Sequence, residues 1–182
     1  MNWKDIEHQM YTMCMVADGD KILLMNRPKH KGAPGFIAPG GKVEFPESIT
    51  DAAIREVLEE TGLHVKNIVF KGWDEYVNPQ EKVRYIVFNY LADSFEGTLL
   101  ADPPEGELQW VSRKDAMELP MQDWFKRKLP LFFKEGTFEI HSEWEAEQEL
   151  EGDSKTRIFL KSEGRVGRIE NSPAVKRDSP SC

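Results

Sequence analysis

GKVEFPESITDAAIREVLEETGL, residues 41–63, is the most informative segment of this 182-residue chain. Ser48, with Asp51 three residues later, is a candidate helix N-cap, and the run after it has no Pro or Gly until Gly62. Glycine readily adopts the left-handed conformation in which many helices end. The segment therefore predicts a short helix over residues 51–61.

One face of this predicted helix carries a concentration of negative charge. Glu56, Glu59 and Glu60 are three or four positions apart, so their carboxylates lie on one face within one turn. Their repulsion destabilises an isolated helix, and either Arg55 or a divalent cation would offset it. Carboxylate oxygens suit Mg²⁺ or Mn²⁺, which keep several waters and bridge to substrate oxygens. The spacing favours a cation site, and a solvated acidic helix is the structural alternative.

The loop before the helix has the composition of a phosphate-binding segment. It reads APGGK, residues 38–42, and its paired glycines let the backbone approach a ligand closely. Lys42 adds a positive charge that suits a phosphate. The loop and the acidic helix together predict a site that holds divalent cations against phosphate groups.

Composition narrows the class of protein. The net charge of −8 argues against binding of duplex nucleic acid, and it means that bound cations must attract any polyphosphate. The chain shows no secretion signal and no apolar run long enough for a membrane span, so we expect a cytoplasmic protein. The two cysteines have no zinc-ligand spacing. Nothing in the sequence indicates the oligomeric state.

The chain reads as one domain, residues 1–160, followed by a tail. Strands are expected at residues 10–17, 21–26, 83–92, 108–111 and 136–144, and one or two strands at residues 65–77. Further helices are expected at residues 113–119 and 122–133, with Pro130 kinking or ending the second. This order predicts an α+β or α/β sandwich. Six acids in residues 143–153 predict a solvated strand edge, and the Lys-, Arg-, Ser- and Pro-containing residues 161–182 predict a disordered basic tail.

The segment at residues 41–63 resembles the Nudix box, Gly-x5-Glu-x7-Arg-Glu-aliphatic-x-Glu-Glu-x-Gly-aliphatic. Every position of the box is filled, by Gly41, Glu47, Arg55, Glu56, Val57, Glu59, Glu60, Gly62 and Leu63. The chain is thus similar to Nudix hydrolases over roughly residues 10–140, with specific motifs only at residues 40–63. The resemblance implies an α+β fold, a Nudix-type α/β/α sandwich with a mixed β-sheet, for residues 1–160.

The resemblance also implies a reaction, in which water hydrolyses a nucleoside diphosphate linked to another group and releases phosphate or pyrophosphate. Glu56 and Glu60 would hold two or more Mg²⁺ ions, with Glu59 as a further ligand and the carbonyl of Gly40 as another. Mn²⁺ is the alternative cation. Glu47 and Arg55 would form an ion pair that orients these carboxylates. Gly41, Lys42 and Arg27, the last in the NRP segment after the second strand, would contact the substrate.

The sequence does not decide which residue is the base that deprotonates water. In relatives, a Glu from a distant loop often joins the site, and Glu105 in PPEGELQWV resembles that residue. Glu107 competes with Glu105 for this role. Glu59 or Glu60 of the helix would serve instead.

The flanking segments GFIAPGGKVE, FEGTLL with GELQWV, and LPLFFKEGTFEIH resemble the MutT-like, 8-oxo-dGTP diphosphatase branch. This favours a purine nucleoside triphosphate, with an oxidised guanine nucleotide among the candidates. One departure is Ile37, because some oxidised-guanine enzymes have an Asn there that reads the base, and Ile cannot hydrogen-bond. Phe36, Tyr76 and Trp124 are candidates to stack on a base. Guanosine alarmones, nucleotide sugars, capped RNA ends and a non-catalytic nucleotide-binding regulator are the alternatives.

Overall fold

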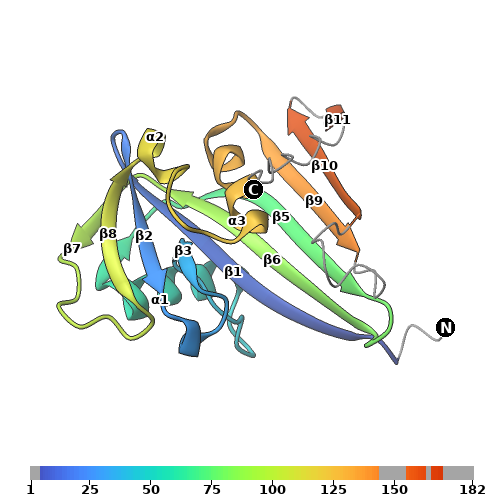
Figure 1. The fold of residues 1–182 in the computed structure, drawn as a ribbon, viewed down its shortest axis with the longest axis horizontal. Helices are drawn as coiled ribbons and strands as arrows, with labels where there is room; N and C mark the ends of the chain where they lie inside the picture. Colours follow the sequence, from blue (N-terminus) through green and yellow to red (C-terminus); the bar gives the residue numbers. More distant parts are fainter. Residues whose placement is uncertain (1–4, 144–154, 163–164, 170–182) are drawn as a thin grey trace, which may run out of the picture.

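The computed structural model describes residues 5–143, 155–162 and 165–169. The strands are β1 (Glu7–Asp18), β2 (Lys21–Arg27), β3 (Gly35–Ile37), β4 (Leu63–Val65), β5 (Val69–Asn78), β6 (Val83–Ala92), β7 (Phe95–Gly97), β8 (Glu107–Ser112), β9 (Thr137–Glu143), β10 (Lys155–Ser162) and β11 (Arg165–Ile169). The helices are α1 (Ile49–Thr61), α2 (Arg113–Ala116) and α3 (Asp123–Lys128), with 3₁₀ turns η2 (Lys29–Lys31) and η3 (Leu129–Phe133). Figure 1 shows their arrangement.

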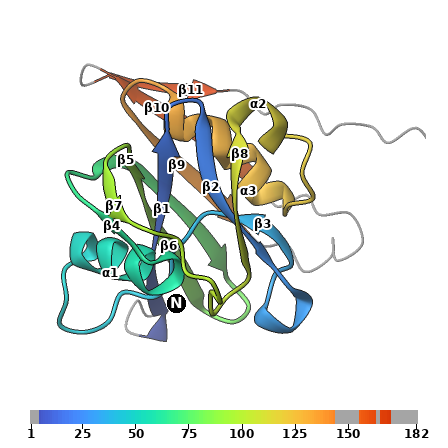
Figure 2. The same cartoon turned by 90° about the vertical axis from the view of Figure 1, so that its left-hand side faces the viewer.

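A nine-stranded mixed sheet forms the centre of the fold. Its order is β11-β10-β9-β5-β6-β1-β2-β3, and β8 pairs with β2 off this path. The β1–β6 and β5–β9 pairs are parallel, whereas the other neighbours are antiparallel. β4 and β7 form a separate two-stranded sheet. Helix α1 lies on one side of the central sheet and α2 and α3 lie on the other (Figure 2), so the expected mixed sheet between helices is confirmed.

Residues 12–17 of β1 are buried on both faces, which explains the nearly continuous apolar run there. Cys14 and Val16 pack towards Val57 of α1. Met13 and Met15 point the other way, into a core that also contains Phe125, Leu129 and Phe132 of the α3–η3 segment. The alternation of side chains along one strand thus joins the two hydrophobic cores.

Local sequence signals explain where α1 begins and ends. The Ser48 hydroxyl accepts a hydrogen bond from the backbone N–H of Asp51 at 3.1 Å and caps the first turn. Gly62 ends the helix in the left-handed conformation with φ of 80°, and its N–H donates to the carbonyl of Leu58. The predicted helix is therefore confirmed, with two residues added at its N-terminal end.

Several expected elements differ from the structure. The one or two strands expected over residues 65–77 are two with shifted bounds, β4 at Leu63–Val65 and β5 at Val69–Asn78. The helix expected at residues 122–133 stops at Lys128, because Pro130 stands at the start of η3 and cannot continue an α-helix. The helix expected at residues 113–119 is only one turn, α2. The sequence predicts no strand where the three-residue strands β3 and β7 form.

The sheet also continues into the segment for which we expected disorder. β10 ends at Ser162 and β11 spans Arg165–Ile169, which corrects that expectation for these residues. Ile158 and Leu160 pack on the cluster of Leu131, Phe138 and Ile140, so this extension has apolar surface to bury. Residues 170–182 and most of the acidic run at 143–153 lie outside the described residues.

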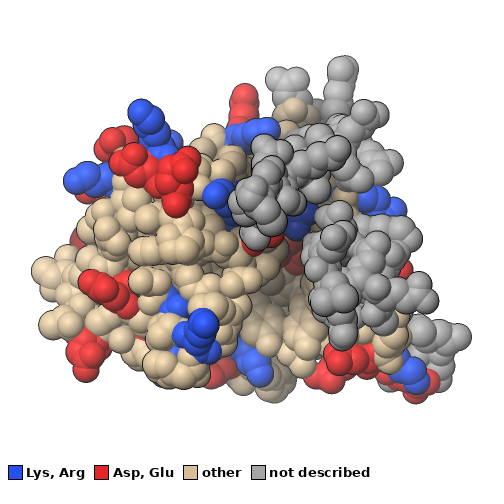
Figure 3. Space-filling model, viewed as in Figure 1, with Lys and Arg blue, Asp and Glu red and all other residues tan. Residues whose placement is uncertain are grey.

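Two further observations concern the surface and the length of the helices. On the face drawn in Figure 3, acidic and basic side chains of the described residues are interspersed around an uncharged region. Among the described residues, no helix combines the length and the apolar character needed to cross a membrane.

Candidate active site

The loop at residues 38–42, called the glycine loop below, lies between β1 and β2. These strands pair only near their hairpin, at Ala17–Ile22 and Asp18–Lys21. Beyond that point the loop hydrogen-bonds to β1, with the Thr12 N–H donating to the carbonyl of Gly41 at 2.8 Å. A side chain at Gly40 would collide with the carbonyl of Thr12, and one at Gly41 would collide with the carboxylate of Glu56. Gly40 is therefore needed to bring the backbone against β1, whereas the neighbour of Gly41 is the flexible end of the Glu56 side chain.

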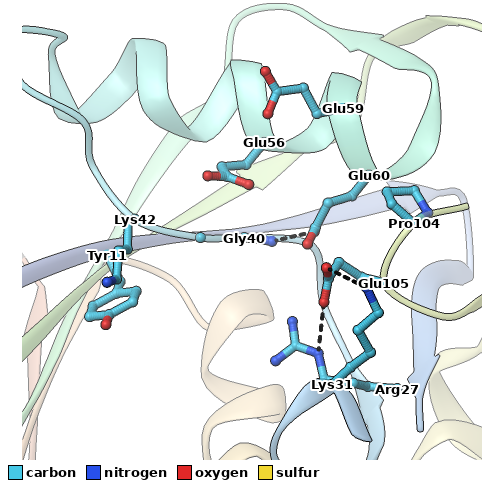
Figure 4. Close-up of a pocket in the computed structure, with 11 residues that line it drawn as sticks. Tyr11, Arg27, Lys31, Gly40, Lys42, Glu56, Glu59, Glu60, Pro104 and Glu105 are labelled. Atoms are coloured by element: carbon cyan, nitrogen blue, oxygen red, sulfur yellow. Dashed lines mark hydrogen bonds and ion pairs between the residues drawn. The ribbon is translucent and has the colours of Figure 1, made fainter.

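A pocket of about 590 Å³ opens beside this loop (Figure 4). Five segments line it: β1, the β2–η2 segment, the glycine loop, α1 and the loop before β8. The lining residues are Tyr11, Arg27, Lys31, Gly40, Gly41, Lys42, Glu56, Glu59, Glu60, Pro104 and Glu105. The structure thus brings the predicted residues together, except Glu47 and Arg55, which stand behind the lining.

Arg55 binds the acidic side chains from behind. Its Nε and Nη2 donate to the two carboxylate oxygens of Glu47 at 3.0 and 2.7 Å. Its Nη1 donates to Glu56 at 2.9 Å and to Glu59 at 3.0 Å. The hydrogen bonds from Arg55 lower the pKa of Glu47 to about 2. The expected Glu47–Arg55 ion pair is present, and the same guanidinium also fixes two pocket carboxylates.

Glu60 is in a different environment. It is 5% exposed, and one carboxylate oxygen accepts a hydrogen bond from the Gly40 N–H at 2.9 Å. Among the described residues, no Lys, Arg or His forms an ion pair with Glu60. Burial raises the pKa of Glu60 to about 7, and burial also raises the pKa of Glu56. Ionised carboxylates in this position are costly unless a cation approaches them.

The comparisons with known proteins agree with this geometry. The family model of the NUDIX domain matches residues 7–132, which is well over half of the chain. The chain belongs to the Nudix hydrolase family. This Nudix hydrolase is therefore an enzyme that cleaves pyrophosphate bonds, and its family typically acts on small nucleotides with a divalent metal.

The Nudix chain is 35% identical over 116 residues to the uncharacterized Nudix hydrolase YvcI of Bacillus subtilis, an overlap of 62% of this chain and 72% of that protein. It is 34% identical over 97 residues to the NAD-capped RNA hydrolase NudC of Vibrio parahaemolyticus, covering 53% of this chain but only 35% of that protein. A crystal structure of a MutT protein from Bacillus halodurans superposes with a TM-score of 0.70 at 30% identity, covering 82% of this chain and 97% of that one.

The Nudix site fits a divalent cation in its chemistry. Glu56, Glu59 and Glu60 offer hard oxygen donors, and buried Glu60 has only a backbone N–H to balance its charge. However, within the described ranges no three His, Cys, Asp or Glu side chains already converge around one ion position. Arg55 Nη1 donates to one carboxylate oxygen of each of Glu56 and Glu59, so its hydrogen bonds hold both side chains at the pocket.

The raised pKa of Glu60 predicts that metal affinity depends on pH. Glu60 is protonated below about pH 7, and a divalent ion binds only the anion, so the proton must leave as the ion binds. Affinity for Mg²⁺ is expected to rise about tenfold from pH 6 to pH 8. Titration calorimetry at pH 6, 7 and 8, in two buffers of different ionisation enthalpy, measures both the affinity and the released proton. Equal affinity at pH 6 and 8 would contradict this expectation, and Glu60→Gln should remove the dependence.

Other candidate residues lie elsewhere in the Nudix fold. Glu107 is exposed on β8 opposite Asn26 and does not line the pocket. Phe36 is buried in the core, and Trp124 contacts Lys128 of α3 at 5.0 Å from its ring. Tyr76 packs beside Tyr85, so none of the three aromatic candidates lines the pocket.

Three lining residues were not among the predicted site residues: Tyr11, Lys31 and Pro104. Tyr11 belongs to the apolar run of β1, where an aromatic residue is expected to be part of the core. Lys31 is one of several cations in the loop after β2. Only the tertiary structure distinguishes it from its neighbours, so no local signal identifies either residue.

Proposed function

We propose that this Nudix hydrolase cleaves a pyrophosphate bond of a purine nucleoside triphosphate and depends on Mg²⁺. The observation that carries the proposal is the charge arrangement of the pocket. Three carboxylates of α1 line it together with three cations, Arg27, Lys31 and Lys42. A polyphosphate with bound Mg²⁺ carries charges that complement both groups, and the volume of about 590 Å³ is in the range of small-ligand sites.

In this proposal Glu56, Glu59 and Glu60 hold Mg²⁺ with the carbonyl of Gly40. Bound there, the metal would neutralise the phosphates and polarise the attacked phosphorus. Arg27 and Lys42 orient the phosphate chain from the other side of the pocket. Arg55 and Glu47 keep the carboxylate face in position.

The hydrolysis joins a water oxygen to phosphorus and breaks the bridging P–O bond, and a carboxylate must take the water proton. Glu105 is the proposed base, because it comes from a separate segment and lines the same pocket as the metal-binding carboxylates. Glu59 remains the alternative base. Its side chain is 58% exposed and held only at one edge by Arg55.

The likeness to MutT-type proteins supports a purine nucleoside triphosphate as the substrate. An oxidised guanine nucleotide is one candidate within that class. Ile37 is buried and has no group that can read the edge of a base. A panel of 8-oxo-dGTP, dGTP, GTP, ATP and dCTP, assayed with Mg²⁺ and analysed for phosphate and pyrophosphate, tests this assignment. Purine triphosphates should exceed dCTP by at least about tenfold in kcat/KM. Activity on 8-oxo-dGTP no better than on GTP would exclude a role in removing oxidised nucleotides.

A second candidate substrate class is a nucleoside diphosphate linked to another group, such as a capped RNA end, a nucleotide sugar or a guanosine alarmone. The similarity to an NAD-capped RNA hydrolase favours it, although this chain spans about a third of that protein. Adding NADH, NAD-capped RNA, a nucleotide sugar and a guanosine alarmone to the panel separates the two classes. Equal, low phosphate release from the parent, Glu56→Gln and Glu60→Gln would instead support a non-catalytic nucleotide-binding regulator.

A further inference from the structure

Three charged side chains meet at the pocket wall across from α1. Glu105 comes from the loop before β8, Arg27 ends β2, and Lys31 lies in η2. The Lys31 Nζ lies 3.6 Å from Glu105 Oε1, and the Arg27 Nε lies 4.0 Å from Glu105 Oε2 (Figure 4). This Arg27–Glu105–Lys31 cluster joins two loops that are far apart in the sequence.

The cluster is a poor structural ion pair. Both contacts are too long to be hydrogen bonds, and partly exposed pairs at such distances add little to stability. The Arg27 Nε is buried and has no hydrogen-bond acceptor among the described residues. A buried N–H without an acceptor is costly, and native structures rarely retain one without a reason. The cluster carries one excess positive charge. An anion whose oxygens come closer to the two cations than Glu105 does would neutralise this charge and give the Arg27 Nε an acceptor.

The position of the cluster identifies that anion. Arg27 and Lys31 line the same pocket as the carboxylates of α1, so a ligand that reaches both carries an extended row of oxygens. Phosphate oxygens accept from guanidinium and ammonium groups at shorter distances than the present contacts. The Glu105 carboxylate, which lies beside the two cations, competes with phosphate oxygens for them.

We infer that Arg27 and Lys31 bind the terminal phosphate of the substrate. Until that phosphate arrives, the carboxylate of Glu105 occupies the phosphate's position beside the two cations. This inference rests on the proposed function and adds a coupling to it. When the phosphate takes the two cations, Glu105 is released to the part of the pocket where a base is needed. Lys31 is then a specificity-determining residue, because a diphosphate that leaves this position empty does not release Glu105.

The exchange is tested by binding alone, with methylenediphosphonate as the probe in MgCl₂, because its bridging carbon prevents hydrolysis. The variants are Lys31→Gln, Glu105→Gln and the double variant. Lys29→Gln is the matched control, since Lys29 lies in the same 3₁₀ turn but does not line the pocket. Inorganic phosphate in a second series reports whether a single phosphate suffices. Circular dichroism verifies that each variant folds.

Lys31→Gln is expected to weaken methylenediphosphonate binding about tenfold, and Lys29→Gln less than about twofold. Glu105→Gln is expected to tighten binding about threefold or more, because the competing carboxylate is gone. Lys31→Gln should cost more in the Glu105→Gln background than in the parent, since no competitor then masks the contact. Binding that is undetectable in the parent, unaffected by Lys31→Gln, or weakened by Glu105→Gln would overturn the inference.

An activity measurement separates this inference from the proposed function. Lys31→Gln should lower kcat/KM for a nucleoside triphosphate about tenfold relative to the matching diphosphate, with a pronounced fall in kcat because Glu105 is no longer released in step with binding. An unchanged triphosphate-to-diphosphate ratio would overturn the coupling. If the parent cleaves no triphosphate but the binding pattern holds, the proposed function fails and the phosphate site stands.

Discussion

Replacing Glu60 by Gln is expected to lower kcat/KM by at least about a thousandfold while stabilising the metal-free protein at pH 8. The loss follows because the amide cannot supply an anionic oxygen to a divalent ion. The gain follows because the carboxylate is buried, so that its pKa of about 7 lies well above the ordinary value. The amide that replaces it keeps an oxygen that can accept from the Gly40 N–H and removes the buried charge.

The sign of the stability effect depends on pH. A proton bound to Glu60 stabilises the folded state fully below the ordinary pKa, and this contribution is lost as pH rises through about 7. Above pH 7 the parent therefore bears a penalty on the order of 3 kcal/mol that Glu60→Gln lacks. Thermal unfolding in excess chelator at pH 5 and pH 8 measures the difference, which should be much smaller at pH 5.

Glu107→Gln is the matched control for this change, because Glu107 is an exposed carboxylate outside the pocket. It should leave both activity and melting temperature nearly unchanged. Full activity of Glu60→Gln, or a lower melting temperature than the parent at pH 8, would refute the assignment of Glu60 as a buried cation ligand.

Arg55→Lys is expected to reduce kcat/KM by about ten- to a hundredfold and to raise the Mg²⁺ concentration needed for half-maximal rate. The charge is kept, but a single ammonium cannot replace a guanidinium that donates to Glu47, Glu56 and Glu59 at once. Its Nη2 also donates to the carbonyl of Lys42 at 3.0 Å, so the glycine loop loses an anchor as well.

Metal titrations of the steady-state rate measure this effect. Arg113→Lys serves as the control, because Arg113 contacts the Gly19 carbonyl and the Phe133 ring away from the pocket. A normal Mg²⁺ requirement in Arg55→Lys would mean that the hydrogen bonds from the Arg55 guanidinium do not position the carboxylates.

The local part of the fold and site could be predicted from the sequence. Helix α1 is recognisable because Ser48 and Gly62, which fix its ends, are neighbours of the helix in the chain. The common face of Glu56 and Glu60 follows from helical spacing alone. The Glu47–Arg55 pair followed from the family motif, which records a contact that spacing does not reveal.

Contacts between distant segments could not be predicted in the same way. Lys31 and Glu105 lie far apart in the sequence. They meet at the pocket because β2 pairs with β8, which brings Glu105 beside η2. The Arg55 contacts to Glu56 and Glu59 depend on side-chain conformation, which helical spacing does not determine. Strand β10 is flanked by polar residues, and its pairing with β9 and the packing of Ile158 and Leu160 become visible only in the folded chain.

The strands beyond residue 132 limit how far the enzyme can be shortened. β9 pairs with residues 72–77 of β5, and the Lys71 ammonium donates to the carbonyls of Lys134 and Gly136. A chain truncated at the end of the family-matched segment would expose that edge and lose those acceptors. An unpaired edge of this length invites self-association between copies. A shortened version that keeps this edge of β5 paired therefore includes β9, although β9 contributes no residue to the pocket.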